Sequence, residues 1–148
     1  SGCIDVSAMG KSGDDGGSPT KTKNEELLEG ISAANTGRYQ EAIRILTDVV
    51  SDDPQNADAH NYLGYSYRKS GALERAAEAY RRVFEIDQDH RGALEYQGEL
   101  YLKLGDISSA KRNLVRLTKL CPSGCKEMVE LKRAIADYEA VRNNKKGN

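Results

Sequence analysis

A 34-residue period is the feature that most constrains how this chain can fold. At Gly37, Gly71 and Gly105 one pattern recurs, with an apolar residue two positions after the glycine and an alanine five positions after it. Other positions keep the same step, namely Gly30, Gly64 and Gly98, and then Leu46, Tyr80 and Leu114. A repeat of this length predicts one structural unit used several times, whose apolar faces are buried only by stacking on neighbouring units.

The apolar residues within each period recur at intervals of three and four, which is the spacing of one face of an α-helix. Gly71 and Gly105 follow two such helical stretches, where the chain needs the left-handed backbone conformation that glycine adopts readily. Asp106 suits the N-cap of the helix that comes next. The sequence therefore predicts an all-α fold with helices at residues 24–36, 39–51, 57–70, 73–86, 91–104, 107–120 and 126–142.

The unit at residues 57–90 has small and large side chains at characteristic places, which are Leu63, Gly64, Tyr67, Ala76, Tyr80 and Val83. These residues resemble the signature of the tetratricopeptide repeat (TPR) family, whose unit is a helix–turn–helix of the same length. The units at residues 23–56 and 91–124 resemble it too, although the first departs from the pattern at Glu29 and Ala33. The resemblance implies a TPR solenoid of antiparallel helix pairs, about seven helices in all, wound into a right-handed superhelix.

The chain divides into three parts by composition. Residues 10–23 contain almost nothing apolar, which indicates that residues 1–23 form a disordered N-terminal tether. Residues 24–143 form the TPR domain, in which the helix at 126–142 has one apolar and one charged face and caps the last repeat. Residues 144–148 are expected to be a frayed basic tail.

The first three residues, Ser1, Gly2 and Cys3, resemble the end of a bacterial lipobox, in which small residues precede a cysteine that becomes lipidated. On that interpretation Cys3 tethers an exported protein to a membrane, and the location is the bacterial periplasm or a membrane-anchored lipoprotein. The other interpretation, an arbitrary fragment start or a cloning remnant, stays open, and a cytoplasmic location stays open with it.

The charge balance argues against nucleic acid as a partner. The chain has 22 Lys and Arg against 23 Asp and Glu, a net charge of −1, whereas phosphate binding needs a basic surplus or a basic face. The two histidines, His60 and His90, have no metal-type spacing to a cysteine and are assigned to packing or to the surface. Since no phosphate-binding loop or nucleophile motif is present either, the sequence predicts no cofactor, no metal and no enzymatic activity.

The family resemblance implies a concave groove, lined by the first helix of each repeat, that receives a peptide or protein segment. The inward positions are Leu27, Ile31, Ala34, Asn61, Tyr65, Arg68, Lys69, Glu95, Glu99 and Leu102. An alternative is that these are ordinary solvent-facing residues. The positions where related domains grip a chaperone's C-terminal carboxylate hold Leu27, Ile31, Gly92 and Tyr96, which argues against a chaperone tail as the ligand.

Cys121 and Cys125 flank Pro122 and Gly124 at the junction between the third repeat and the capping helix. A disulfide that fixes the exit of the capping helix ranks first among the interpretations, free thiols second, and a metal or thiol-redox site third.

The function expected from these features is a non-catalytic adaptor that binds a peptide or protein segment in its concave groove, as part of a bacterial envelope assembly. One alternative is a structural or self-associating module that uses its convex face or the ends of the repeat array. The other alternative gives Cys121 and Cys125 a thiol-redox or metal role.

Overall fold

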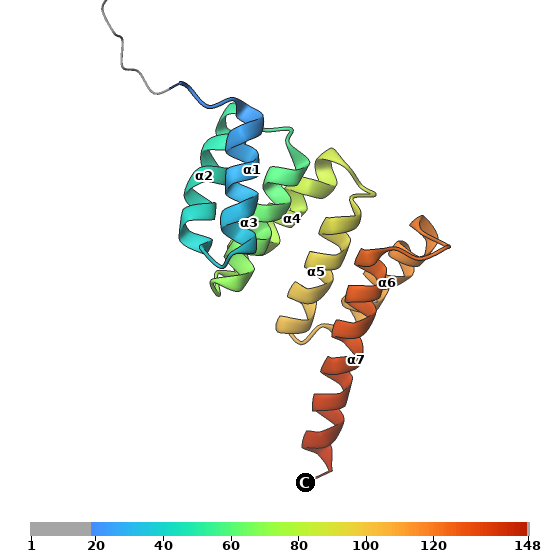
Figure 1. Ribbon diagram of the computed structural model, residues 1–148. Helices are drawn as coiled ribbons and strands as arrows, with labels where there is room; N and C mark the ends of the chain where they lie inside the picture. The colour runs from blue at the N-terminus through green and yellow to red at the C-terminus, as the bar shows by residue number, and fades with distance from the viewer. Residues whose placement is uncertain (1–18, 148) are drawn as a thin grey trace, which may run out of the picture.

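The computed structural model describes residues 19–147, and its secondary structure there is α-helical (Figure 1). The helices are α1 (Lys23–Asn35), α2 (Tyr39–Asp52), α3 (Ala57–Lys69), α4 (Leu73–Ile86), α5 (Arg91–Lys103), α6 (Ile107–Leu120) and α7 (Lys126–Lys146). Since residues 19–147 contain no strand, the predicted all-α class is confirmed.

The helix boundaries follow the local signals in the sequence. The first six helices begin and end within one residue of the predicted positions. Gly71 and Gly105 have positive φ angles of 88° and 78°, so each ends a helix in the left-handed region as expected, and Gly37, with a φ angle of 79°, does the same after α1. Asp106 caps α6, because its Oδ1 accepts a hydrogen bond of 3.1 Å from the backbone N–H of Ser109.

The two ends of the helical region differ from the prediction. A capping box between Thr22 and Glu25 begins α1 at Lys23, the last residue of the predicted tether, most of which lies outside the described residues. Helix α7 extends to Lys146, whereas the sequence predicted its end at residue 142. The predicted frayed tail is therefore wrong for residues 144–146, which are helical. No glycine or proline interrupts α7 before Gly147, and basic side chains in its last turn interact favourably with the helix dipole.

The helices pack as three antiparallel pairs, α1 with α2, α3 with α4 and α5 with α6. The first helices of successive pairs also contact one another, α1 with α3 and α3 with α5, and α7 continues this row by packing against α5 (Figure 1). Helix α7 therefore occupies the place that the first helix of a fourth pair would take. One face of the protein is consequently formed by α1, α3, α5 and α7.

Close approach between helices depends on glycines that repeat with the period. A Cβ atom added at Gly64 would lie 2.5 Å from Cε1 of Tyr80, which is completely buried in the α3/α4 pair. Gly30 meets Leu46 in the same way within the first pair. At Gly98, however, the large partner is Leu131 of α7, at 2.6 Å from the added Cβ. The period would instead indicate Leu114 of α6, which aligns with Leu46 and Tyr80. The capping helix is thus part of the core.

We expect Gly64→Ala to lower the free energy of unfolding by roughly 1–3 kcal/mol, because the added methyl group overpacks the site against the buried Tyr80 ring. Chemical denaturation monitored by circular dichroism measures this change. Gly147→Ala serves as the control, since its Cβ would have no neighbour closer than 3.8 Å. Equal stability of wild type and Gly64→Ala would show that the pair does not depend on this contact.

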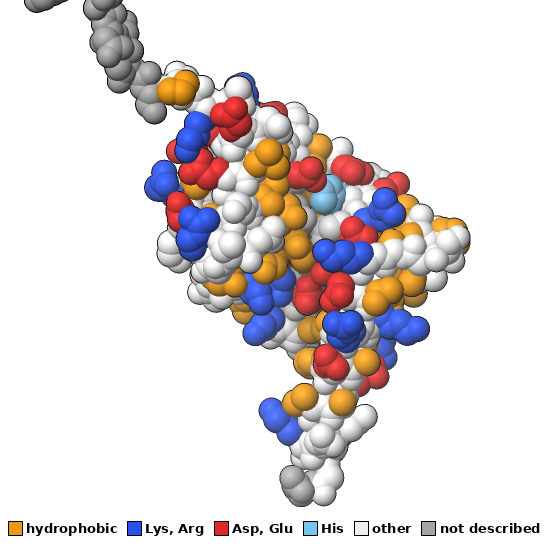
Figure 2. Space-filling model, viewed as in Figure 1, with side chains coloured by type: hydrophobic (Ala, Val, Ile, Leu, Met, Phe, Trp, Pro, Cys, Tyr) orange, Lys and Arg blue, Asp and Glu red, His pale blue; other side chains and the backbone are white. Residues whose placement is uncertain are grey.

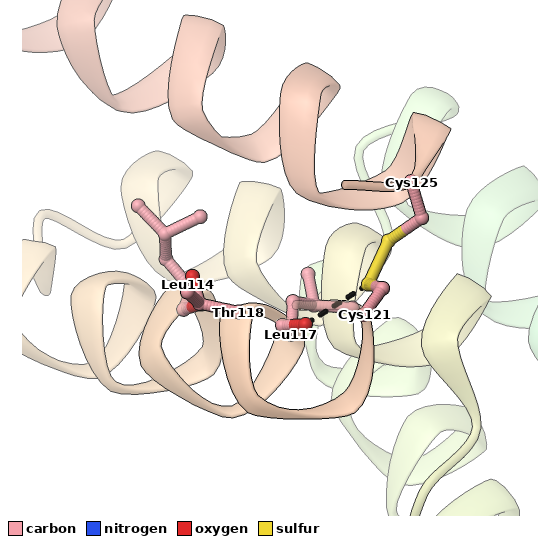
Figure 3. Close-up of a disulfide and its surroundings, with 5 residues drawn as sticks. All are labelled: Leu114, Leu117, Thr118, Cys121 and Cys125. Atoms are coloured by element: carbon pink, nitrogen blue, oxygen red, sulfur yellow. Dashed lines mark hydrogen bonds between the residues drawn. A yellow bond between two sulfur atoms is a disulfide. The ribbon is translucent and has the colours of Figure 1, made fainter. Parts of the chain in front are cut away.

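A disulfide between Cys121 and Cys125 joins the end of α6 to the start of α7 (Figure 3). Their Cα atoms are 5.9 Å apart, within the range that a disulfide allows, and the chain turns through Gly124, whose φ angle is 94°. The described residues contain no group of three or more His, Cys, Asp or Glu side chains placed to hold a metal ion. The geometry therefore favours the staple, while the redox state of the pair in the cell stays a prediction.

We expect protein isolated from its native compartment to resist alkylation at Cys121 and Cys125 until a reductant is added, as measured by intact mass. Reduction should also lower the free energy of unfolding by about 2 kcal/mol at most, because the closed loop is short. The double variant Cys121→Ala/Cys125→Ala is the control, and its melting temperature should not respond to the reductant. Alkylation of both cysteines without reductant would contradict the staple.

Candidate functional site

The face formed by α1, α3, α5 and α7 is the candidate binding groove. Figure 2 shows hydrophobic side chains along this face, with acidic and basic side chains beside one another over its middle. Two hollows open on it. The Asn61 pocket, of about 310 Å³, is lined by residues that include Ile31, Asn61, Tyr62, Glu95, Tyr96 and Lys126. The Arg68 pocket, of about 320 Å³, is lined by Arg68, Glu99, Leu102, Lys103, Ala134 and Tyr138.

A cluster of tyrosine rings lies in the groove between the two pockets. The ring centroids of Tyr65 and Tyr96 are 4.9 Å apart, and Tyr62 meets both rings edge-on at 6.4 and 6.2 Å. Tyr39 of α2 adds a further edge contact to Tyr65 at 6.2 Å. Aromatic pairs at these distances stabilise one another. The four rings of Tyr39, Tyr62, Tyr65 and Tyr96 are called the tyrosine platform below, an apolar surface that also carries hydroxyl groups.

Arg68 is buried beneath this platform. Its guanidinium carbon lies 5.4 Å from the ring centroid of Tyr65 and 5.7 Å from that of Tyr96, which are cation–π distances. Its Nη2 is 3.5 Å from Oε2 of Glu99, whereas its buried Nε has no hydrogen-bond partner within the described residues. The charge of Arg68 is therefore balanced by one carboxylate and two aromatic faces, with one donor left unused.

Asn61 has a similar unused polar atom. The residue is only 3% exposed, and its Oδ1 accepts no hydrogen bond within the described residues. Turning the amide about the last torsion of the Asn side chain brings Oδ1 to the pocket and puts Nδ2 in its buried place. A ligand can therefore pair with one end of this amide, whose buried end carries a desolvation cost.

Glu95 of α5 also lines the Asn61 pocket and is 8% exposed. Burial raises the pKa of its carboxyl group to about 8, and the nearby carboxylates of Glu99, Glu130 and Glu127 contribute in the same direction. Glu95 is thus mostly neutral at pH 7 in the free protein, although it lies in an acidic surrounding.

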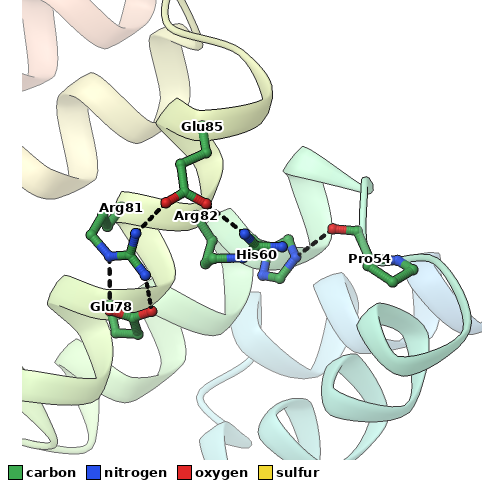
Figure 4. Close-up of polar contacts among 6 residues, drawn as sticks. All are labelled: Pro54, His60, Glu78, Arg81, Arg82 and Glu85. Carbon is green, nitrogen blue, oxygen red and sulfur yellow. Dashed lines mark hydrogen bonds and ion pairs between the residues drawn. The ribbon is translucent and has the colours of Figure 1, made fainter.

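The histidines have structural roles in the described part of the chain. The Nδ1 atom of His90 accepts a hydrogen bond from the backbone N–H of Ala93 and caps α5, so the ring proton lies on Nε2 and is donated to Asp58 at 2.7 Å. His60 is buried, and its Nε2 donates to the carbonyl oxygen of Pro54 at 2.9 Å (Figure 4). The predicted packing role suits His60, while the capping role of His90 was not foreseen, because N-cap side chains are usually Ser, Thr, Asp or Asn.

The structure brings most of the predicted groove residues together. Asn61, Tyr65, Arg68, Glu95, Glu99 and Leu102 lie on α3 and α5 along one face, and Ile31 of α1 lines the Asn61 pocket. Lys69 is exposed at the edge, with its Nζ 5.9 Å from the Tyr65 ring. Leu27 lies elsewhere, in a separate hollow with residues of α2. Ala34 is completely buried in the core.

Sequence reasoning missed several members of the groove. Tyr62 was not named, and Tyr96 was considered only as a position of the carboxylate clamp, yet both complete the aromatic cluster. Lys126, Ala134 and Tyr138 come from α7. The α7 residues could have been found by treating the capping helix as the first helix of another repeat, because that is the place it occupies.

Comparison with known proteins agrees with this architecture. A family model described as tetratricopeptide repeat matches residues 27–90. Human tetratricopeptide repeat protein 13 is 30% identical over 105 residues, which cover 68% of this chain and 12% of that protein. This chain is a tetratricopeptide repeat protein. The aligned segment represents a small part of the human relative's length, so the activities of that whole protein do not transfer to it.

Solved TPR structures have the same fold. The TPR domain of Sgt2 from Aspergillus fumigatus superposes with a TM-score of 0.70 at 21% identity, over 88% of this chain and 85% of that chain. PcrH in complex with the chaperone-binding region of PopD has a TM-score of 0.67 at 22% identity, over 82% and 92% of the two chains. At these identities the likeness establishes the fold and nothing finer.

The described helices were also compared with the requirements of a membrane span. Within residues 19–147 no helix is long and apolar enough to cross a bilayer. Cys3, the predicted lipidation site, lies outside the described residues.

The raised pKa of Glu95 predicts how stability changes with pH. The folded protein holds this proton up to about pH 8, whereas an unfolded chain releases it near pH 4.5, so the stabilising contribution is complete at low pH and is lost as the pH rises between these values. We expect the stability of the wild type to fall relative to Glu95→Gln by about 1–3 kcal/mol between pH 5 and pH 8.5.

Urea denaturation at a series of pH values measures this difference. Glu74→Gln, at an exposed position in the first turn of α4, is the matched control and should follow the wild type at every pH. Parallel pH profiles for the wild type and Glu95→Gln would mean that Glu95 titrates normally in the folded protein.

Proposed function

We propose that this TPR protein is a non-catalytic adaptor that binds an extended segment of a partner protein in the groove of α1, α3, α5 and α7. The observation that carries this proposal is the tyrosine cluster with Arg68 at its base, placed between two hollows on one face. Tyrosine and arginine are the side chains most enriched at the centres of protein interfaces, because they bury large areas and still form hydrogen bonds.

The amide group of Asn61 supports a polypeptide as the ligand. It lines the Asn61 pocket, and its Oδ1 has no donor within the described residues. An extended peptide presents both backbone N–H and C=O groups, together with side chains that fit separate pockets. The two pockets on either side of the platform suit two side chains of such a segment.

We further propose that the protein acts in a bacterial envelope assembly and is held at a membrane through lipidated Cys3. The support for this is the resemblance of Ser1, Gly2 and Cys3 to the end of a lipobox. Mass spectrometry of the N-terminal peptide from native membranes tests it, since a diacylated Cys3 is expected and an unmodified cysteine would remove the anchor.

A second candidate function uses the other side of the solenoid. On α6, Val115 is 53% exposed in a hollow lined by Lys111, Arg112 and Arg116. An exposed apolar side chain within a basic patch favours contact with an acidic protein surface, as a structural or self-associating module would need.

We expect Tyr65→Ala to weaken binding at least about tenfold to peptides selected from a random display library on the immobilised full-length chain. Truncation removes the ring at the centre of the platform, and fluorescence anisotropy with the selected peptides measures the loss. Circular dichroism must first show that the variant remains folded, because Tyr65 also packs partly against the core.

Val115→Ala is the control on the opposite helix layer and should leave the affinity unchanged. If Val115→Ala weakens binding while Tyr65→Ala does not, the convex surface is the binding site. Failure of the library to yield any binding peptide would count against recognition of a linear segment.

A further inference from the structure

The Asn61 pocket is lined by side chains of two different chemistries. Two are the rings of Tyr62 and Tyr96, which meet edge-on at 6.2 Å. Two others are the carboxyl groups of Glu95 on α5 and Glu127 on α7. Aromatic rings and carboxylates in the lining of one pocket can hold an organic cation, because the ring faces carry partial negative charge and the carboxylates supply the full charge.

The charges around Glu95 leave this pocket with an acidic excess. The carboxyl group of Glu95 is near Glu99 on α5 and Glu127 and Glu130 on α7. Asp58 of α3 also lines the pocket, and its carboxylate accepts a hydrogen bond from His90. Arg68 of α3 is the nearest buried cation, but it is already placed against Glu99 and the tyrosine rings. Lys126 is exposed on the rim and forms no ion pair within the described residues, so its ammonium group is free to stay in water.

Asn61 adds a polar group to the pocket, whose Oδ1 can accept a hydrogen bond from a donor when the amide is turned toward the pocket. Asn61 is 3% exposed, and its Oδ1 has no hydrogen-bond donor within residues 19–147. A metal ion is not the matching ligand, because the described carboxylates include no group placed to coordinate one. An ammonium or guanidinium group instead offers several N–H donors, enough to satisfy Asn61 and Glu95 together.

We propose that the Asn61 pocket receives a lysine or arginine side chain of the bound partner segment, held against the Tyr62 and Tyr96 rings by Asn61 Oδ1 and the carboxylate of Glu95. This inference rests on the proposed function, because it assigns the chemistry of one side chain of the segment that lies in the groove. The volume of about 310 Å³ leaves room for a long basic side chain.

Entry of the cation is coupled to a proton. In the free protein Glu95 keeps its proton at pH 7, since its pKa is raised to about 8. A positive charge in the pocket favours the ionised carboxylate, so binding releases close to one proton at pH 7. If only the ionised form binds, the affinity rises about tenfold between pH 7 and pH 9, while arginine and lysine remain charged.

The test uses peptides selected on the full-length chain at pH 7, each compared with a version in which arginine is replaced by citrulline or lysine by norleucine. Isothermal titration calorimetry at pH 7 and pH 9, in buffers of different ionisation enthalpy, gives the affinity and the number of protons released. Glu95→Gln removes the titrating group, and Glu74→Gln is the matched change of charge outside the groove.

We expect a basic residue in the selected peptides, at least a tenfold loss of affinity for the neutral analogues, and proton release that disappears in Glu95→Gln but persists in Glu74→Gln. Peptides that bind in a Tyr65-dependent way without a basic residue and without proton release would overturn the cation pocket while leaving groove binding intact. If neither Tyr65→Ala nor Glu95→Gln changes the affinity for the peptides, the proposed function and this inference are both overturned.

Discussion

The structure depends on the close approach of helices at glycine. Gly64 lets α3 lie directly on the ring of Tyr80, and Gly30 accommodates Leu46 in the same way. The contact is the same in the first two pairs, so the helices of each of these pairs approach one another at equivalent glycines and the pairs can stack as repeats. Because Gly98 receives Leu131 of α7, the last helix is held by an equivalent contact and closes the core that the third pair would otherwise leave open.

The regular stacking also buries polar side chains in the groove. Lining up α1, α3, α5 and α7 on one face buries polar side chains that a single helix pair would leave in water. Arg68 is compensated by Glu99 and two tyrosine rings, whereas Glu95 stays neutral because burial and neighbouring carboxylates oppose its charge. Natural folds satisfy nearly all of their buried polar groups, so the amide of Asn61, which lines a pocket, is informative about ligands. The Nε of Arg68 lies instead in the core near the hydroxyl of Tyr80, which also has no partner within the described residues.

The helices were predictable to within one residue except at α7, because caps, left-handed glycines and apolar spacing are local signals. The end of α7 was missed for the opposite reason. A basic, polar segment has no apolar spacing to indicate a helix, yet nothing in it stops a helix that already has a well-packed start. The capping role of His90 escaped prediction because His is an unusual N-cap residue, and the bond from its Nε2 to Asp58 joins residues 32 positions apart in the sequence.

The sequence by itself determined the repeat, the class of fold, the helix boundaries and the face on which Asn61, Tyr65, Arg68, Glu95 and Glu99 lie, since each follows from spacing along one helix. Only the tertiary structure decided that Tyr62 and Tyr96 meet across α3 and α5, that α7 supplies carboxylates around Glu95, and that Asn61 is left without a donor. The burial and the charge of a groove residue depend on three or four helices at once, so they cannot be predicted from the spacing of residues within one helix.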